Sequence, residues 1–321
     1  MPYRTTWRVR RTAAAVLAAA TVAAMASAAA PPSSAGAAGR HASKPVVYYL
    51  SLGDSYSVGY QPGMGNTAGY TAYVAKKTKT QLENFGCGGA TTTSIGSQIG
   101  CNAPAAFDPV PYPTETQLQA ALDFIAAHPG QVGLVTVSIG GNDVTACARA
   151  SDPVSCVATA VAGIQTNVTA LAGALGGALT SAGDSSAHIV GLTYPDVILG
   201  DYVYPPGSPN VSLANLSITA FDLLINPALQ KAYTSVSQGS FVNVTSAPYK
   251  KATSGDDTGS TSSSSPTPQE ATTKLKPYGV IPDAVWEVCK LTYFCSEGNI
   301  HANTKGYDFI GHLIVADLAS L

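Results

Sequence analysis

The sequence predicts an α/β fold in which a parallel sheet is covered by helices on both faces. Short apolar runs rich in β-branched and aromatic residues alternate along the chain with longer segments of helical periodicity. Several of the short runs end abruptly in glycine followed by polar residues. No internal repeat interrupts this alternation. Both faces of such a sheet are buried, which suits strands that are apolar throughout.

Five short apolar runs are expected to form the strands, at residues 46–52, 81–85, 132–139, 188–193 and 240–244. Five segments are expected to form the helices, at residues 69–79, 117–127, 155–179, 212–236 and 306–321. In residues 117–127, for example, apolar side chains recur with the helical period. Pro227 is expected to break the helix at 212–236, because proline lacks the N–H that the helix needs.

The first 38 residues are expected to be a signal peptide and leader. Four arginines precede an apolar, alanine-rich run that ends at Met25, and small residues of the AxA type follow. An N-terminal membrane anchor is the alternative, but the run is short for a span of about 20 residues. Residues 39–321 are expected to form one domain, with residues 252–273 as a low-complexity surface insertion rich in Ser, Thr, Gly and Pro.

Charge and composition exclude some partners. Charged residues make up 11% of the chain, and the net charge of −2 becomes −6 once the four arginines of the leader are removed. We expect no nucleic-acid partner, because phosphate binding needs a basic face. We also expect that no further apolar stretch spans a membrane. The protein is expected to be a monomer.

The six cysteines are expected to form disulfides, because a secretory signal implies an oxidising compartment. A zinc site is the alternative, but no CxxC pair is present. Sequence proximity suggests the pairs Cys87–Cys101, Cys147–Cys156 and Cys289–Cys295.

Polar residues follow three of the expected strands, at glycine turns. These turns carry Ser55, Gly89 and Asn142, and His301 lies just before the last expected helix. Ligands bind at the carboxyl ends of strands in an open α/β sheet. If the sheet is parallel, the three turns share one edge, and the loop that holds His301 is able to reach it.

This set of residues suits acyl transfer. A serine nucleophile needs an adjacent base, for which His301 is the candidate, and the oxyanion needs donors fixed in advance. The backbone N–H groups of Ser55 and Gly89 and the side-chain amide of Asn142 would supply those donors. The alternatives are that Ser55 only caps a helix and that His301 is structural.

Four segments in this order resemble the conserved blocks of the SGNH/GDSL hydrolases. Residues 53–55 read Gly-Asp-Ser, like the nucleophile block, and residues 84–91 resemble the block whose glycine donates to the oxyanion. Residues 140–143 match the GxND pattern, and residues 300–307 resemble the block around the catalytic histidine. The resemblance implies a three-layer α/β/α sandwich of the flavodoxin-like type, with about five parallel strands, that hydrolyses esters.

Residue by residue, the resemblance implies that Ser55 is the nucleophile, that Gly89 and Asn142 line the oxyanion hole and that His301 is the base. One position departs from the family pattern. The family has an aspartate three residues before the histidine, where this chain has Gly298. The Gly298 carbonyl, Glu297 or a distant acid such as Asp283 is left to orient the histidine.

The sequence therefore predicts a secreted serine esterase or lipase that forms an acyl-enzyme and needs no cofactor or metal. A small-molecule or lipid ester with an apolar acyl chain is the expected substrate. Residues 194–209, aromatic and rich in proline, are expected either to line an acyl pocket or to pack as a loop. A phospholipase and a carbohydrate deacetylase are alternatives within the enzyme class. The missing aspartate also leaves open a non-catalytic binding module.

Overall fold

The structure is a computed structural model that describes residues 46–103, 105–245 and 272–321. The expected signal peptide lies outside these residues, as does all of the expected insertion except residues 272 and 273. The chain divides into two units, Met1–Ser43 and Lys44–Leu321, and the fold below is that of the second unit.

The second unit is built on one parallel sheet of five strands, as predicted. Its order is β4-β1-β5-β6-β7, and every neighbouring pair is parallel. This is the flavodoxin-like order, in which ligands bind beside the strand where the winding reverses. The strands are β1 (Tyr48–Gly53), β4 (Gln81–Asn84), β5 (Val132–Ser138), β6 (His188–Leu192) and β7 (Gly239–Val242).

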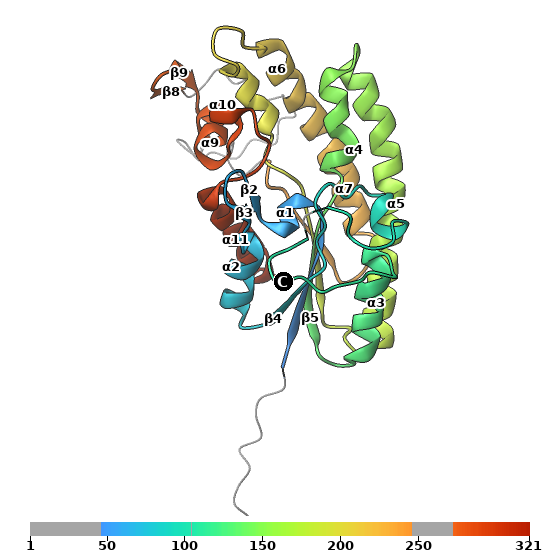
Figure 1. Ribbon diagram of the computed structural model, residues 1–321. Helices are drawn as coiled ribbons and strands as arrows, with labels where there is room; N and C mark the ends of the chain where they lie inside the picture. Colours follow the sequence, from blue (N-terminus) through green and yellow to red (C-terminus); the bar gives the residue numbers. More distant parts are fainter. Residues whose placement is uncertain (1–45, 104, 246–271) are drawn as a thin grey trace, which may run out of the picture. The chain divides into compact units, whose positions relative to one another are not determined.

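Helices cover both faces of the sheet and complete the three layers (Figure 1). On one face, α2 (Gly69–Thr78) and α11 (Thr304–Leu318) bury their apolar sides with the strands. On the other face, α3 (Gln117–Ala127), α5 (Pro153–Ser181) and α7 (Asn226–Tyr233) do the same. Two apolar cores therefore lie back to back across the sheet and fix the positions of the strand ends.

A further layer of short elements lies beyond the carboxyl ends of the strands (Figure 1). Its own apolar cluster joins side chains of the 3₁₀ segment η3, α6, β9, α9 and α10. The sequence pattern did not predict the hairpin or the two helices that follow it in this layer. The elements are η3 (Val197–Tyr202), α6 (Val211–Ala220), the hairpin β8 (Thr272–Leu275) and β9 (Gly279–Pro282), α9 (Asp283–Leu291) and α10 (Phe294–Glu297).

The helix expected over residues 212–236 is continuous, with one irregular turn. It comprises α6, a π-helical turn η4 (Phe221–Ile225) and α7. Pro227 lies in the first turn of α7 and does not end the helix. The expectation of a break at Pro227 was therefore wrong. A wider π turn immediately before the proline accommodates its missing N–H.

Small elements complete the edge of the sheet where the strands end. They are α1 (Ser55–Val58), the hairpin β2 (Tyr60–Gln61) and β3 (Gly65–Asn66), the 3₁₀ turns η1 (Ser94–Gly96) and η2 (Ala146–Arg149), and α4 (Gly141–Thr145). Both α1 and α4 begin within three residues of a strand end. Each therefore holds the residues of one turn in a fixed orientation.

Three disulfides stabilise this edge. They join Cys87 to Cys101, Cys147 to Cys156 and Cys289 to Cys295, which are the pairs that sequence proximity suggested. The first closes the loop that holds Gly89, the second links η2 to α5, and the third links α9 to α10. The first two bridges limit the movement of segments that follow β4 and β5, and the third holds together two helices of the outer layer.

Two helices meet the length and hydropathy of a membrane span, contrary to the expectation that none would. They are Pro153–Ser181 and the continuous helix Val211–Tyr233. Buried side chains of α5 and α7 belong to the apolar core against the sheet. A core helix of a soluble protein passes the same test, so this observation is weak support for a membrane span.

Candidate active site

The turn after β1 places Ser55 at the start of a short helix. Gly53 has a φ of 134°, and a Cβ there would lie 2.0 Å from the Ser138 carbonyl oxygen, so only glycine fits. Asp54 is the N-cap of α1, and its Oδ1 accepts the Tyr56 N–H at 3.0 Å. The cap is therefore Asp54, and the Ser55 side chain is available for another contact.

That contact is with His301. The Ser55 Oγ and the His301 Nε2 lie 2.8 Å apart, although 246 residues separate them in the chain. The histidine lies in the loop between α10 and α11, and its carbonyl accepts the Tyr293 N–H at 3.0 Å. The expected meeting of the turn after β1 with the loop before the last helix is thus present in the structure.

The His301 ring is enclosed by aromatic side chains. Tyr60 lies edge-on at 4.7 Å between ring centroids, and Tyr56 stacks at 6.0 Å. The Tyr56 hydroxyl also donates to the Ile300 carbonyl at 2.7 Å, which ties α1 to the histidine loop. Burial lowers the pKa of His301 to about 4. The imidazole is therefore neutral at neutral pH, as a general base must be.

Asn299 orients the histidine, and the sequence-based candidates do not. Its Oδ1 lies 2.7 Å from the His301 Nδ1 and also accepts the His301 backbone N–H at 3.1 Å. Glu297, proposed from sequence, is exposed at the end of α10 and makes no hydrogen bond to the ring. Among the described residues, neither the Gly298 carbonyl nor Asp283 takes the Nδ1 contact either.

The Asn299 contact settles the tautomer of the imidazole. An amide oxygen only accepts, so Nδ1 carries the proton and Nε2 is the acceptor that faces Ser55. Asn-X-His forms an Asx turn, in which a side-chain oxygen accepts the N–H two residues later. The Asn-X-His spacing is the sequence signal for this turn.

Two backbone N–H groups are available as oxyanion donors. Across the described residues, the N–H groups of Ser55 and Gly89 have no protein acceptor. Gly89 has a φ of 75°, and the position that a Cβ would occupy is open. A substrate oxygen is therefore able to approach this part of the backbone.

Asn142, in the first turn of α4, lies next to both other parts of the expected oxyanion hole. Its Nδ2 donates to the Ala90 carbonyl at 2.8 Å and faces the Asp54 Oδ2 at 3.4 Å. The neighbouring Asp143 accepts the Thr92 N–H at 3.0 Å and the Thr92 hydroxyl at 2.7 Å. These hydrogen bonds between Asp143 and Thr92, which the sequence did not reveal, fix the Gly89 loop against α4.

The sequence model of the GDSL-like lipase/acylhydrolase family matches residues 51–258. The chain belongs to this family. Membership of this family identifies the protein as an ester-cleaving hydrolase. No curated protein sequence matches the chain.

Several solved structures resemble this GDSL-like hydrolase. The lipase Lip_vut3 from a goat rumen metagenome is 16% identical, with a TM-score of 0.49 over 84% of this chain and 97% of that one. A phospholipase A1 from Streptomyces albidoflavus is 21% identical, with a TM-score of 0.42 over 63% and 81%. A putative arylesterase from Agrobacterium tumefaciens is 15% identical, with a TM-score of 0.47 over 86% and 99%.

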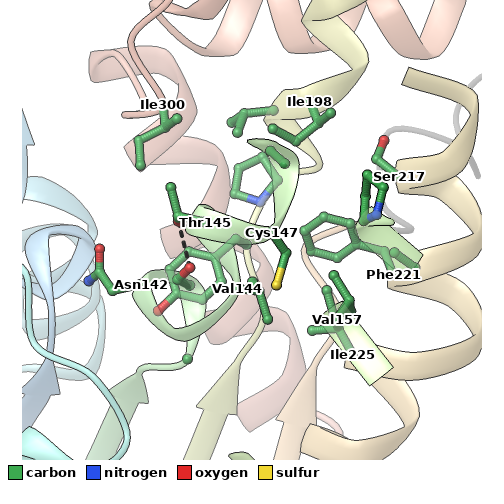
Figure 2. A pocket seen from close by; sticks show the side chains of 18 of the residues that line it. Asn142, Val144, Thr145, Cys147, Val157, Ile198, Ser217, Phe221, Ile225 and Ile300 are labelled. Atoms are coloured by element: carbon green, nitrogen blue, oxygen red, sulfur yellow. Dashed lines mark hydrogen bonds between the residues drawn. The ribbon is translucent and has the colours of Figure 1, made fainter. Parts of the chain in front are cut away.

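A deep apolar pocket opens beside Ser55 in this GDSL-like hydrolase. Its enclosed volume is about 120 Å³, and most of its wall is aliphatic or aromatic. Figure 2 shows Asn142 at one side of the pocket and Val157, Phe221 and Ile225 at the opposite side. The wall comes from α4, η2, α5, η3, α6 and the π turn.

The segment 194–209 has both of the roles that the sequence left open. Tyr194 and Ile198 line the pocket. Tyr202 instead packs in the apolar cluster of the outer layer, and Tyr204 lies edge-on to Phe294 at 6.0 Å. The first part of this segment therefore forms pocket wall, and the later part is loop packing.

Two buried carboxyls lie close to the pocket. Asp54 lies in the turn before Ser55, and Asp196 accepts a hydrogen bond of 2.7 Å from Ser217 Oγ. Burial raises the pKa of each to about 7. In the part of the chain that the structure describes, no group of three or more His, Cys, Asp or Glu side chains is placed to hold a metal ion.

Proposed function

We propose that this protein is a secreted serine esterase or lipase that cleaves esters of apolar acyl chains through an acyl-enzyme on Ser55. The observation that carries the proposal is the hydrogen-bonded series Asn299–His301–Ser55, with contacts of 2.7 and 2.8 Å. It has the parts that nucleophilic catalysis requires, namely a nucleophile, a base and a group that orients the base.

In the first half of the reaction, Ser55 Oγ attacks the ester carbonyl and its proton passes to His301 Nε2. The tetrahedral oxyanion accepts hydrogen bonds from the N–H groups of Ser55 and Gly89 and from the Asn142 amide. His301 then gives the proton to the leaving alkoxide, the C–O bond breaks, and the alcohol departs.

In the second half, His301 takes a proton from water, and the hydroxyl adds to the acyl carbonyl. The same donors hold the second oxyanion. The bond to Ser55 Oγ breaks, Oγ recovers its proton from His301, and the carboxylic acid leaves. Asn299 accepts from Nδ1–H throughout and so stabilises the imidazolium through a neutral oxygen, less strongly than a carboxylate would.

The pocket supports an acyl chain rather than an acetyl group as the occupant. Its wall is apolar and extends from Ser55 to Ile225, a space much larger than a methyl group needs. Each buried methylene of the chain would contribute about 0.8 kcal/mol to binding. The same feature favours an esterase or lipase over the carbohydrate deacetylase that the sequence left open.

Secretion is supported by two independent features. The N-terminal pattern of four arginines and an apolar run is typical of a signal peptide, and the mature chain carries three disulfides. We propose that residues 1–38 are removed on export and that residues 39–321 form the single hydrolase domain.

A fluorophosphonate probe tests the nucleophile directly. We expect the purified protein to be labelled with loss of activity, and the Ser55→Ala variant to show no labelling. Ser97→Ala, a change at an exposed serine of the Gly89 loop, is the matched control and should label as the wild type does. Equal labelling of Ser55→Ala and wild type would refute the proposed function.

A panel of p-nitrophenyl esters from acetate to decanoate then tests the substrate class. We expect kcat/KM to rise with chain length, because the pocket is apolar over its whole depth. Phosphatidylcholine and an acetylated sugar extend the panel to the two alternatives. Preference for the acetylated sugar would contradict the proposed acyl specificity while leaving Ser55 as the nucleophile.

A further inference from the structure

Three hydrogen-bond donors share the buried side chain of Asp54. Its Oδ1 accepts the Tyr56 N–H at 3.0 Å. Its Oδ2 accepts the Tyr194 hydroxyl at 2.5 Å and faces the Asn142 Nδ2 at 3.4 Å. The carboxyl is 1% exposed, so water does not replace these partners. It therefore links the nucleophile turn, the oxyanion hole and the pocket wall.

Tyr194 is held against the same segment by its ring as well as its hydroxyl. A Cβ at Gly141 would lie 2.9 Å from the Tyr194 Cζ, so the ring lies flush against the residue that precedes Asn142. The ring also lies edge-on to Tyr56, with centroids 5.1 Å apart. Tyr194 thus contacts residues on both sides of the site, Gly141 of α4 and Tyr56 of α1.

The two donors on Asp54 Oδ2 are unequal. The Tyr194 contact of 2.5 Å is short, as expected for a hydroxyl on a carboxylate, whereas the Asn142 contact of 3.4 Å is at the limit of a hydrogen bond. The other Asn142 N–H is held by the Ala90 carbonyl at 2.8 Å. The weakly held N–H is consequently the one that is able to turn toward an oxyanion.

We propose that Tyr194 is a positioning residue that keeps the Asn142 amide available to the oxyanion by saturating the Asp54 carboxylate. Without the tyrosine hydroxyl, Oδ2 would draw in the Asn142 N–H and withdraw it from the reaction. This inference rests on the proposed function, because it assumes an oxyanion beside Ser55. It also couples the wall of the acyl pocket to the oxyanion hole through Asp54.

The protonation of Asp54 supports the assignment. Burial raises its pKa to about 7, and the hydrogen bond from Tyr194 opposes that rise. The charged or titratable groups that interact with it are Tyr56 of α1, Asp143 of α4 and Tyr194, with Tyr70 of α2, Tyr233 of α7 and Tyr307 of α11 beyond them. A proton on Oδ2 would remove an acceptor that the Tyr194 hydroxyl and the Asn142 amide share, so the carboxylate suits these donors best.

The test compares Tyr194→Phe with wild type, using p-nitrophenyl butyrate as the soluble probe. The phenyl ring keeps the pocket wall, so KM should change less than about twofold. We expect kcat to fall about tenfold or more, because removal of an oxyanion donor costs about 10² to 10³ and here the donor is misplaced. The acid limb of kcat near pH 7 should move to higher pH, because the bond that lowers the pKa of Asp54 is lost.

Tyr233→Phe is the matched control. Tyr233 is also fully buried, but its hydroxyl has no partner among the described residues and it does not line the pocket. Because its hydroxyl makes no hydrogen bond to Asp54, its kcat should equal that of wild type, and its acid limb should move much less than that of Tyr194→Phe. An unchanged kcat in Tyr194→Phe, or a lower kcat with the acid limb in place, would overturn the inference.

Asp54→Asn gives a second test if Tyr194→Phe is too unstable to assay. With no ionisable group at residue 54, the limb near pH 7 should disappear, leaving the His301 limb near pH 4. A limb that persists near pH 7 would overturn the inference. Fluorophosphonate labelling of the same preparations distinguishes the two possible failures. If wild type is labelled, only the inference about Tyr194 has failed; if wild type is not labelled, the proposed function has failed.

Discussion

The side-chain oxygen of Asn299 accepts two hydrogen bonds from His301, one from the ring and one from the backbone. One uncharged atom therefore fixes both the tautomer of the imidazole and the start of the loop that holds it. A carboxylate at this place would add a negative charge, which the site does without. The activity of Asn299 variants should reveal these two contributions separately.

Asn299→Ala should lower kcat/KM about 100-fold, or about 2.7 kcal/mol of transition-state stabilisation, because the ring loses its orienting partner. Asn299→Asp should keep most activity and move the His301 limb of the pH profile upward from about 4, because a carboxylate favours the imidazolium. Rates of p-nitrophenyl butyrate hydrolysis between pH 3 and 9 provide both measurements.

Glu297→Gln is the control for this series. Its side chain is exposed and makes no contact with His301, so kcat/KM should stay within about threefold of wild type. A loss as large as that of Asn299→Ala would return the orienting role to Glu297. A pH profile of Asn299→Asp identical to that of wild type would show that residue 299 does not interact with the histidine in solution.

Ile225→Trp should shorten the acyl chain that the enzyme prefers. Ile225 is buried at the side of the pocket opposite Asn142, so a larger side chain there fills the depth without touching Ser55 (Figure 2). We expect kcat/KM for p-nitrophenyl decanoate to fall at least about tenfold, or about 1.4 kcal/mol, with little change for the acetate.

Leu223→Trp, in the same π turn, is the comparison variant for pocket depth. Leu223 is 63% exposed and does not line the pocket, so the chain-length profile should match wild type. If Ile225→Trp and wild type had the same profile, the acyl chain would have to bind elsewhere.

The stability of the protein should depend on pH through Asp196. Its pKa is about 7 in the folded protein and about 3.9 in the unfolded chain, so the folded state binds its proton more tightly. Its contribution to the free energy of unfolding is therefore fully present below pH 4 and is lost as the pH rises to 7. The slope is at most about 1.4 kcal/mol per pH unit.

Urea unfolding at pH 4 to 8 of wild type and Asp196→Asn measures this contribution. The difference in unfolding free energy between the two proteins should change across the interval and level off above pH 7. Asp123→Asn, at an exposed carboxyl of α3, should run parallel to wild type. A constant difference between Asp196→Asn and wild type would contradict the assignment.

The sequence predicted the sheet and the meeting of Ser55 with His301, because both follow from local patterns. Strand ends marked by glycine define one edge of a parallel sheet. The four segments that resemble the blocks of the SGNH/GDSL hydrolases predict that His301 lies beside this edge. The orienting group was missed because its role depends on a side-chain rotamer. Asn299 and Glu297 are two residues apart in sequence, and only the Asx turn decides which one faces the ring.

The outer layer was harder to predict for a different reason. Helices α9 and α10 are short, and their apolar side chains pack on η3 and α6, far away in the sequence. The hydrogen bonds that converge on Asp54 also could not be predicted from the sequence, because its partner Tyr194 is 140 residues away. Pairing across such distances leaves no periodic signal in a single sequence.

The π turn at Phe221–Ile225 lies between a part of the helix that lines the pocket and a part that packs in the core. A π turn is equivalent to one residue inserted into an α-helix. α6 and the π turn supply most of the pocket lining that this helix contributes, whereas α7 adds Leu229 and otherwise packs against β6 in the core. Loss or gain of that single residue would rotate the pocket wall relative to Ser55 while α7 kept its packing. In this chain, a change of length at this turn would therefore reshape the pocket without altering the sheet, Ser55 or His301.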